Sequence, residues 1–469
     1  MERLMAMDTA KEAALLEQVL DQAKDFLNSR GERFVAPRHP RQAPAPLAEE
    51  GLGAQGALDL FREVYEDHML ASSGPRYFGF VIGGVTPAAL AGDWLTSLYD
   101  QNAFGYPENV DRDIEDQVVD AIRQLLNLKE GWFGSLCSGG TMANFVGLAT
   151  ARQWIGRQLG VPVSEEGLMA LDKVNLVGGC THASTYKAIS MLGMGRKNLT
   201  AIPCYPGREA VNLELLEEYL QQKKGQPVVV IANLGTANSG DYDDMAAIAR
   251  LKEKYGFYLH VDASIIGIAA CSPQYAPIFE GLEQADSISV DAHKWLNTTY
   301  DAALQLTKHP DLQYQAFAQS ASAPGAMPAD SPLFNFTPEG SRRFRALPLW
   351  FSLMAYGRSG YRQLVESNCS LAQELGARMA ATPYFRLMND VRLNIVCYTL
   401  KVDNPTGELI NRFAARLREK GVTYSNTTVY NGVPAIRICL SNYLTTKEDV
   451  DLAYDSILET AREFLPGRE

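Results

Sequence analysis

The chain has 469 residues, of which 46% are hydrophobic and 21% charged; this is the range of ordinary folded proteins and excludes a mainly disordered chain. The formal net charge is −12, from 43 basic and 55 acidic side chains, so the overall field disfavours nucleic acids and anionic membranes as partners. At this length a single hydrophobic core usually divides, and we expect two or three parts.

Cysteine usage and hydropathy narrow the class of protein further. The seven cysteines are scattered without a CxxC pair, so the sequence predicts neither a zinc site nor a disulfide framework, and no metal is expected. There is no uncharged apolar stretch of about 18 residues, which argues against a membrane span. The first residues mix acids and bases and lack the apolar centre of a signal peptide, so we expect a cytoplasmic protein.

The first hundred residues predict a helical arm. Apolar residues recur at helical spacing over residues 10–28, and a second helical pattern follows near residues 57–70. The prolines within residues 36–47 exclude a helix or a central strand there and predict an extended strap.

Residues 130–310 predict a parallel sheet. Short apolar, β-branched runs alternate there with helical patterns at residues 212–223 and 243–255. Near-continuously apolar strands separated by helices are typical of a sheet covered on both faces, and ligands bind at the carboxyl ends of such strands. The expected strands are at residues 173–177, 200–204, 227–232, 258–261 and 287–290.

After about residue 375 the pattern changes to strand, helix, strand and helix, which predicts a separate, smaller α/β domain. The fold class is therefore α/β with a mostly parallel sheet. We expect an N-terminal arm and strap over residues 1–100, a large domain over 101–370 and a small domain over 371–469. The strands and helices of the small domain are expected at residues 393–400, 407–420, 435–440 and 447–464.

A lysine follows the strand predicted at residues 287–290, in the segment SISVDAHKWL. Lysine is rarely fully buried, so Lys294 at a strand end indicates either an amine nucleophile or a surface residue. Upstream, Asp262 ends another apolar strand in YLHVDAS. Together the two residues predict a cofactor with an aldehyde and a basic ring nitrogen, because a nearby carboxylate keeps such a nitrogen protonated. A protonated ring is the electron sink of pyridoxal phosphate.

Two further motifs are consistent with this cofactor. The small-residue loop GSLCSGGTMAN, residues 134–144, precedes a helical run at residues 145–154. Glycines allow close backbone approach to an anion, and a helix N-terminus offers it free N–H groups, although a purely structural turn is the alternative. The loop has neither the Walker A spacing nor the GxGxxG spacing of nucleotide-binding loops. His182, after the strand at residues 173–177, could stack on a ring or be structural.

The motifs SGGTMAN, THAS, NLGTANSG, HVDAS, DAHKWL and SRRFRALPLWFSLMAYG occur in this order. The set resembles the group II pyridoxal-phosphate-dependent decarboxylases, which include aromatic-L-amino-acid, glutamate and histidine decarboxylases. The resemblance spans about residues 57–460. It implies the fold type I, aspartate aminotransferase-like architecture, pyridoxal 5'-phosphate as cofactor, and a homodimer with active sites at the interface.

The resemblance also implies roles for single residues. It makes Lys294 the Schiff-base lysine, Asp262 the partner of the ring nitrogen and His182 the residue stacked on the ring, and these three are the predicted catalytic residues. Ser264 replaces a frequent alanine beneath the ring. Asp291 replaces the asparagine of the best-known animal enzymes, and its carboxylate would repel a phosphate unless it is neutralised. The predicted cofactor-binding residues are Gly139, Gly140, Thr141, His182, Thr236, Asp262, Ser264, Asp291, His293 and Lys294.

For the substrate side chain the resemblance points to residues 73–84. Aromatic residues there favour an aromatic or bulky apolar amino acid, although core packing explains many aromatic residues equally well. The basic side chain of Arg76 leaves an acidic amino acid as an alternative substrate. The predicted substrate residues are Tyr77, Phe78, Phe80 and Phe104. An arginine clamp on the substrate carboxylate would favour transamination, and its candidates, which are otherwise structural ion-pair partners, are Arg342, Arg343, Arg345 and Arg437.

The expected reaction is decarboxylation of an L-amino acid to its amine, after the substrate amino group displaces Lys294 from the cofactor. In the aromatic decarboxylases a mobile loop before SRRFR carries a tyrosine that protonates the carbanion. Residues 319–339 contain no tyrosine, only Phe334 and Phe336. Family members with phenylalanine at this position can release an aldehyde instead. Oxidative deamination to an aldehyde, aminotransfer and a non-catalytic scaffold are the alternatives.

Overall fold

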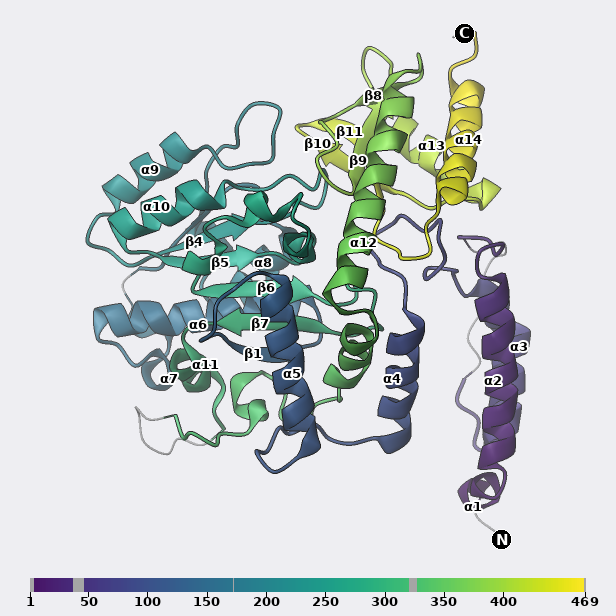
Figure 1. Cartoon of the computed structure of the whole chain (residues 1–469), viewed down its shortest axis with the longest axis horizontal. Helices are drawn as coiled ribbons and strands as arrows, with labels where there is room; N and C mark the ends of the chain where they lie inside the picture. Colours follow the sequence, from purple (N-terminus) through teal and green to yellow (C-terminus); the bar gives the residue numbers. More distant parts are fainter. Residues whose placement is uncertain (1–3, 37–45, 172, 320–326, 468–469) are drawn as a thin grey trace.

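The computed structural model describes residues 4–36, 46–171, 173–319 and 327–467. Within these residues, seven strands form a central sheet in the order β1-β7-β6-β5-β4-β2-β3 (Figure 1). All neighbours pair in parallel except β7, which is antiparallel to β1 and to β6. The strands are β1 (Phe133–Cys137), β2 (Asn175–Gly178), β3 (Leu199–Ala201), β4 (Val228–Asn233), β5 (Tyr258–Asp262), β6 (Ser287–Asp291) and β7 (Ala303–Thr307).

Helices cover both faces of this sheet, which is why its strands are buried on both sides. On one face α6 packs between the sheet and its neighbouring helices, and it is therefore apolar around most of its circumference. This face carries α6 (Gly140–Leu159), α7 (Val163–Glu166), α8 (Ala183–Met191) and α11 (Pro310–Phe317). The other face carries α5 (Val110–Leu125), α9 (Leu213–Gln222) and α10 (Met245–Tyr255).

The small domain contains an antiparallel sheet of four described strands in the order β10-β11-β9-β8, with a hydrophobic core between the sheet and its helices. Thr446 and Asp449 form a reciprocal capping box that fixes the start of the last helix. The elements are β8 (Phe385–Leu387), β9 (Ile395–Leu400), α13 (Gly407–Lys420), β10 (Asn426–Tyr430), β11 (Val433–Cys439) and α14 (Lys447–Phe464).

One long helix, α12 (Ala346–Ala380), contacts both domains. Its backbone leaves helical geometry at Gly357, where φ is +55°, a value that favours glycine. Its first part packs on α4 (Pro87–Tyr99). The two helices approach closely at Gly92, where an added Cβ would lie only 2.8 Å from Pro348 Cα. The predicted domain boundary at residue 370 therefore falls inside a helix, and α4 packs against the large domain rather than the arm.

The N-terminal arm stands beside the rest of the molecule (Figure 1). Its helices are α1 (Leu4–Thr9), α2 (Glu12–Ser29) and α3 (Gly53–Val64), and neither α2 nor α3 buries a described residue. Most of the predicted strap, residues 37–45, lies outside the described residues. Short 3₁₀ helices occur at η1 (Glu66–His68), η2 (Leu168–Ala170), η3 (Arg196–Asn198), η4 (Gly267–Cys271), η5 (Ala276–Phe279), η6 (Leu282–Gln284) and η7 (Leu333–Phe336).

The predicted α/β class and parallel sheet are confirmed, and so are the predicted strands and helices of both domains. The sequence did not predict β1, β7, β8 or β10. No helix of the described ranges is long and apolar enough to cross a membrane, and these ranges hold no cluster of side chains suited to a metal ion. All seven cysteines carry free thiols.

Candidate active site

The loops at the carboxyl ends of five strands line one cavity of about 510 Å³. This is where a parallel sheet places its ligands, because its loops and helix N-termini converge at this edge. The loops contribute residues 138–142 after β1, 180–184 after β2, 233–237 after β4, 262–265 after β5 and 291–294 after β6.

Lys294 enters this cavity beside Asp291, the last residue of β6. Lys294 Nζ lies 3.4 Å from Asp291 Oδ2, and the same oxygen accepts a hydrogen bond from the Gly140 N–H at 3.1 Å. The other oxygen, Oδ1, lies 3.0 Å from His293 Nε2. The Asp291 carboxylate thus lies against the Lys294 amine, the His293 imidazole and the N-terminus of α6, and the helix N-terminus favours its negative charge.

A second buried carboxylate, Asp262, ends β5 within a hydrogen-bond network. It accepts from Asn144 Nδ2 at 2.8 Å and from the Ser264 N–H at 3.1 Å, and Ser289 Oγ lies 3.3 Å away. Asn144 Oδ1 in turn accepts from Ser289 Oγ at 2.7 Å and lies 2.9 Å from His260 Nε2. The orientation of the carboxylate is therefore fixed by contacts from the loop after β5, from β6 and from helix α6.

The electrostatics of the cavity keep Asp262 ionised. Burial on its own raises the pKa of this carboxyl, but the Lys294 charge and the hydrogen bonds from Ser264 and Asn144 outweigh it and hold the pKa below its usual value. An ionised carboxylate in this position can stabilise a protonated ring nitrogen.

His182 is the N-cap residue of α8 and lines the same cavity. Its Nδ1 accepts a hydrogen bond from the Ser184 N–H at 3.2 Å and lies 2.7 Å from Ser184 Oγ. Burial lowers the pKa of His182; Asp262 opposes this shift and Lys294 adds to it. The imidazole is therefore neutral at pH 7, with Nδ1 occupied by the helix cap.

The sequence matches the family model of the pyridoxal-dependent decarboxylase conserved domain over residues 55–401, which is most of the chain. The chain belongs to this decarboxylase family. Phenylacetaldehyde synthase of Petunia hybrida is 27% identical to the decarboxylase over 415 residues, with 83% of this chain and 81% of the relative covered. Aromatic-L-amino-acid decarboxylase of Bacillus atrophaeus is 26% identical over 397 residues, with 80% and 79% covered.

The fold comparison agrees with the family. The crystal structure of Oryza sativa TDC with PLP and tryptamine superposes on the decarboxylase with a TM-score of 0.86 at 22% identity, covering 97% of this chain and 98% of that one. The architecture is fold type I, as the sequence predicted. The decarboxylase is a pyridoxal-phosphate-dependent enzyme that acts on amino acids.

The cavity fits pyridoxal phosphate. The N-terminus of α6 opens onto it, and a Cβ at Gly140 would lie 2.7 Å from Asp291 Oδ2, so only glycine leaves room at this anion cradle. Asn233 lines the cavity, and its Nδ2 is buried without a hydrogen-bond partner among the described residues. Lys294 supplies the amine and Asp262 the buried carboxylate that the aldehyde and ring nitrogen need.

The structure brings together all ten residues predicted to bind the cofactor, and every one of them lines the cavity. They are Gly139, Gly140, Thr141, His182, Thr236, Asp262, Ser264, Asp291, His293 and Lys294.

None of the four predicted substrate residues lines this cavity within the described chain. Phe78 is 1% exposed and belongs to the small-domain core, so its aromatic ring serves packing. Tyr77 stacks on Tyr424 with ring centroids 4.6 Å apart, and Phe80 lies 6.1 Å from the same ring. Phe104 packs against the ring of Phe334 at 5.7 Å.

Three of the four candidate clamp arginines form ion pairs away from the cavity lining. Arg342 is buried with Glu115 at 2.7 Å, Arg343 pairs with Asp93 at 2.6 Å, and Arg345 pairs with Asp301 at 2.8 Å. Arg437 of β11 differs, because it is partly buried and its guanidinium donates to the carbonyl oxygen of Ala237 in the cavity wall.

Sequence reasoning missed three residues that shape the site. Asn144, which holds Asp262, belongs to the quoted loop motif but was given no role. Tyr300 lines the cavity and stacks on His293 with centroids 4.0 Å apart, and only its nearness to Lys294 in sequence was a signal. Glu209, which contacts the cavity wall from behind, lies in a connection between a strand and a helix without any motif.

Proposed function

We propose that this decarboxylase converts an aromatic L-amino acid to its amine. The lining of the cavity carries the proposal, because apolar and aromatic side chains outnumber its cations, which among the described residues are Lys187 and Lys294. An acidic substrate side chain needs a cation, whereas Met142, Met191 and Tyr300 offer apolar and aromatic contacts. Aromatic amino acids are also the substrates named for the curated relatives, among them tryptophan and tyrosine decarboxylases of plants.

The proposed roles of the chain's residues follow from their surroundings. Residues 139–141 would hold the phosphate at the N-terminus of α6, where the Gly140 N–H already donates to Asp291. Asp262 would keep the ring nitrogen protonated, and Lys294 would hold the aldehyde carbon. When bound, pyridoxal phosphate supplies the electron sink for the bond that breaks. The neutral imidazole of His182 presents its free Nε2 side to the bound ring or to the substrate carboxylate.

The exposed surface supports the proposed homodimer. On α4 the side chains of Trp94, Leu98 and Tyr99 are exposed, and on the adjacent α12 so is Met354. Contiguous exposed apolar residues are typical of an interface between chains. Contact of Phe104 or Phe334 with a substrate cavity would then require the partner subunit. A cytoplasmic location stays a prediction.

A panel of amino acids assayed for carbon dioxide and amine tests the substrate class. We expect equal yields of the two products from tyrosine, tryptophan or phenylalanine, with kcat/KM at least about tenfold above that for glutamate, since one unfavourable polar contact contributes 1.4 kcal/mol or more. A preference for glutamate, or keto acid without carbon dioxide, would contradict the proposal.

A second candidate is release of an aldehyde. It is favoured by the absence of tyrosine from residues 319–339 and by the likeness to a phenylacetaldehyde synthase. In that reaction molecular oxygen and water act on the decarboxylated substrate, and aldehyde, ammonia and hydrogen peroxide leave in equal amounts. The same panel distinguishes the two, because only this candidate yields peroxide and aldehyde together with the carbon dioxide.

A further inference from the structure

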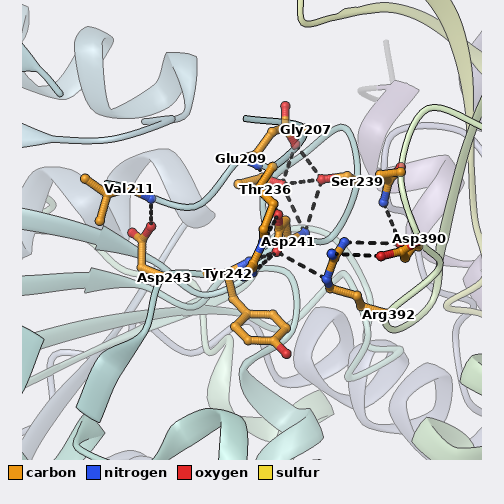
Figure 2. Close-up of polar contacts among 12 residues, drawn as sticks. Gly207, Glu209, Val211, Thr236, Ser239, Asp241, Tyr242, Asp243, Asp390 and Arg392 are labelled. Carbon is orange, nitrogen blue, oxygen red and sulfur yellow. Dashed lines mark hydrogen bonds and ion pairs between the residues drawn. The ribbon is translucent and has the colours of Figure 1, made fainter. Parts of the chain in front are cut away.

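A buried carboxylate without a role in the proposed reaction lies behind the cavity wall. Glu209, in the connection between β3 and α9, is 4% exposed. Its Oε2 accepts hydrogen bonds from Thr236 Oγ1 and from Ser239 Oγ, both at 2.6 Å, and its Oε1 accepts from Asn238 Nδ2 at 2.8 Å. Figure 2 shows Glu209, Thr236 and Ser239 pointing toward one another. No cation of the described chain forms an ion pair with Glu209.

The neighbouring acid of this cluster, Asp241, is compensated quite differently. Arg208 binds it through two hydrogen bonds of 3.1 and 2.6 Å. Arg392 lies 3.8 Å from the same carboxylate and points toward it in Figure 2. Glu209 therefore differs from Asp241 in having no ion-pair partner among the described residues, and it lies in a buried place, where electrostatic interactions are strong.

Glu209 also contacts a second cavity residue. Cys180 Sγ donates to Glu209 Oε1 at 3.6 Å, and both Cys180 and Thr236 line the cavity. A hydrogen bond with Cys204, burial and the charge of Glu209 all raise the pKa of the Cys180 thiol, so it stays protonated and donates. The carboxylate thus accepts hydrogen bonds from two cavity side chains without lining the cavity itself.

The hydrogen bonds of Thr236 determine what it offers to a ligand. A hydroxyl group has one proton and two lone pairs. The proton of Thr236 is directed to Glu209, and the hydroxyl oxygen also accepts the Asp241 N–H at 3.2 Å. Toward the cavity Thr236 can therefore act only as an acceptor.

We propose that Glu209 is a positioning residue of the active site, which acts through Thr236 and Cys180. It gives this wall of the cavity a negative potential and makes the wall accept a hydrogen bond from a protonated group of the bound cofactor or substrate. The inference rests on the cofactor, which the family establishes, and it does not depend on which amino acid is the substrate. Glu209 interacts electrostatically with five titratable or charged groups, which are Cys180, Cys204, Cys397, Tyr430 and Arg437.

The test is a pH titration of the visible absorption of bound pyridoxal phosphate in the whole enzyme. Removing a negative charge near the chromophore lowers its affinity for protons. Glu209→Gln keeps the size of the side chain, and we expect it to lower the midpoint by about one pH unit, a tenfold change in proton affinity. Glu218→Gln, an exposed change on α9, is the matched control and should leave the midpoint unchanged. Equal midpoints in the wild type and in folded Glu209→Gln, or equal shifts in both variants, would overturn the proposal.

Substitutions of Thr236 test the route of the effect and remain informative if Glu209→Gln does not fold. Thr236→Ser keeps the hydroxyl and should keep the midpoint, whereas Thr236→Val should lower it. In a double-mutant cycle, Glu209→Gln should shift the midpoint less in the Thr236→Val background than in the wild type. Full additivity, or identical midpoints for the serine and valine variants, would mean that Glu209 does not act through Thr236. A merely structural role would lower the melting temperature and leave every midpoint in place.

Discussion

Asp262 combines burial with charge, and its replacement gives the most direct test of its role. Asp262→Asn keeps the size of the side chain but removes the charge. A carboxylate about 3 Å from a protonated ring nitrogen contributes roughly 5 kcal/mol at an effective dielectric of about 20, and desolvation reduces this figure. We expect kcat/KM to fall by about 10²–10³-fold, measured with the best substrate of the panel. Full activity in the variant would exclude the proposed pairing with the ring.

Phe334 is the position at which a tyrosine can be introduced to test whether the loop decides between amine and aldehyde. Its ring is partly exposed and packs on Phe104 and Tyr106, whereas Phe336 is 2% exposed and packs on Phe133 at 4.5 Å. If the wild type releases aldehyde, we expect Phe334→Tyr to shift the product toward amine; if it releases amine, the product should stay unchanged. Chromatography of both products measures the ratio.

Phe336→Tyr serves as the comparison, since it buries a hydroxyl group and should lower the free energy of unfolding by about 1–3 kcal/mol. It should leave the product ratio unchanged. A product shift in this variant alone would assign the decision to Phe336.

His260 gives the enzyme a specific response to acid. It is buried in β5, with Nδ1 2.8 Å from Ser287 Oγ, and burial lowers its pKa to about 4 from the usual 6.5. Between these pH values the unfolded chain binds more protons than the folded one, so this residue makes the free energy of unfolding fall as the pH falls from 6.5 to about 4. Urea unfolding of His260→Gln should show a shallower decline over this range than the wild type. Parallel declines would contradict the assignment.

Among the elements, the N-terminus of α6 carries the proposed phosphate cradle, and a side chain at its first residue would meet Asp291. Gly140→Ala would bring a Cβ within 2.7 Å of Asp291 Oδ2, so we expect the dissociation constant of pyridoxal phosphate to rise about tenfold or more. Fluorescence titration of the cofactor-free enzyme measures it. Gly407→Ala is the matched control, because it also changes the first residue of a helix, α13, and meets no atom within 4 Å. Equal affinities in the two variants would argue against the cradle.

Elements with a strong periodic pattern could be predicted from the sequence, and those defined by their neighbours could not. The apolar run of β4 and the amphipathic α13 and α14 show their type directly. β7 contains Gln305 and Thr307, both fully buried, so its sequence does not resemble a core strand, and its place between β1 and β6 depends on pairing.

The same distinction holds for the site. The placement of Lys294 and Asp262 in the site could be predicted, because each lies at the carboxyl end of an apolar strand in a recognisable motif. Glu209 could not, because its importance comes from loops that are distant in sequence and meet only in the folded chain.

At the scale of the whole molecule, the apolar surface of α4 predicts the state of assembly. Leu98 is 67% exposed, and a charge there would be buried without a partner in a dimer. We expect the wild type to sediment at twice the mass of one chain and Leu98→Glu to dissociate at micromolar concentration. Met169→Glu, at a residue 98% exposed on η2, should remain a dimer. A wild-type monomer with full activity would refute the homodimer.

The continuity of α12 has a consequence for recombination between relatives. This element of 35 residues packs on α4 and α5 at one end and on β8 and β9 at the other. Hybrid genes that exchange the C-terminal domain at residue 370 would join two unrelated halves of one helix and mismatch both contact surfaces. The natural crossover point is Gly357, where the backbone already leaves helical geometry, so a transplanted domain must bring its own half of the helix with it.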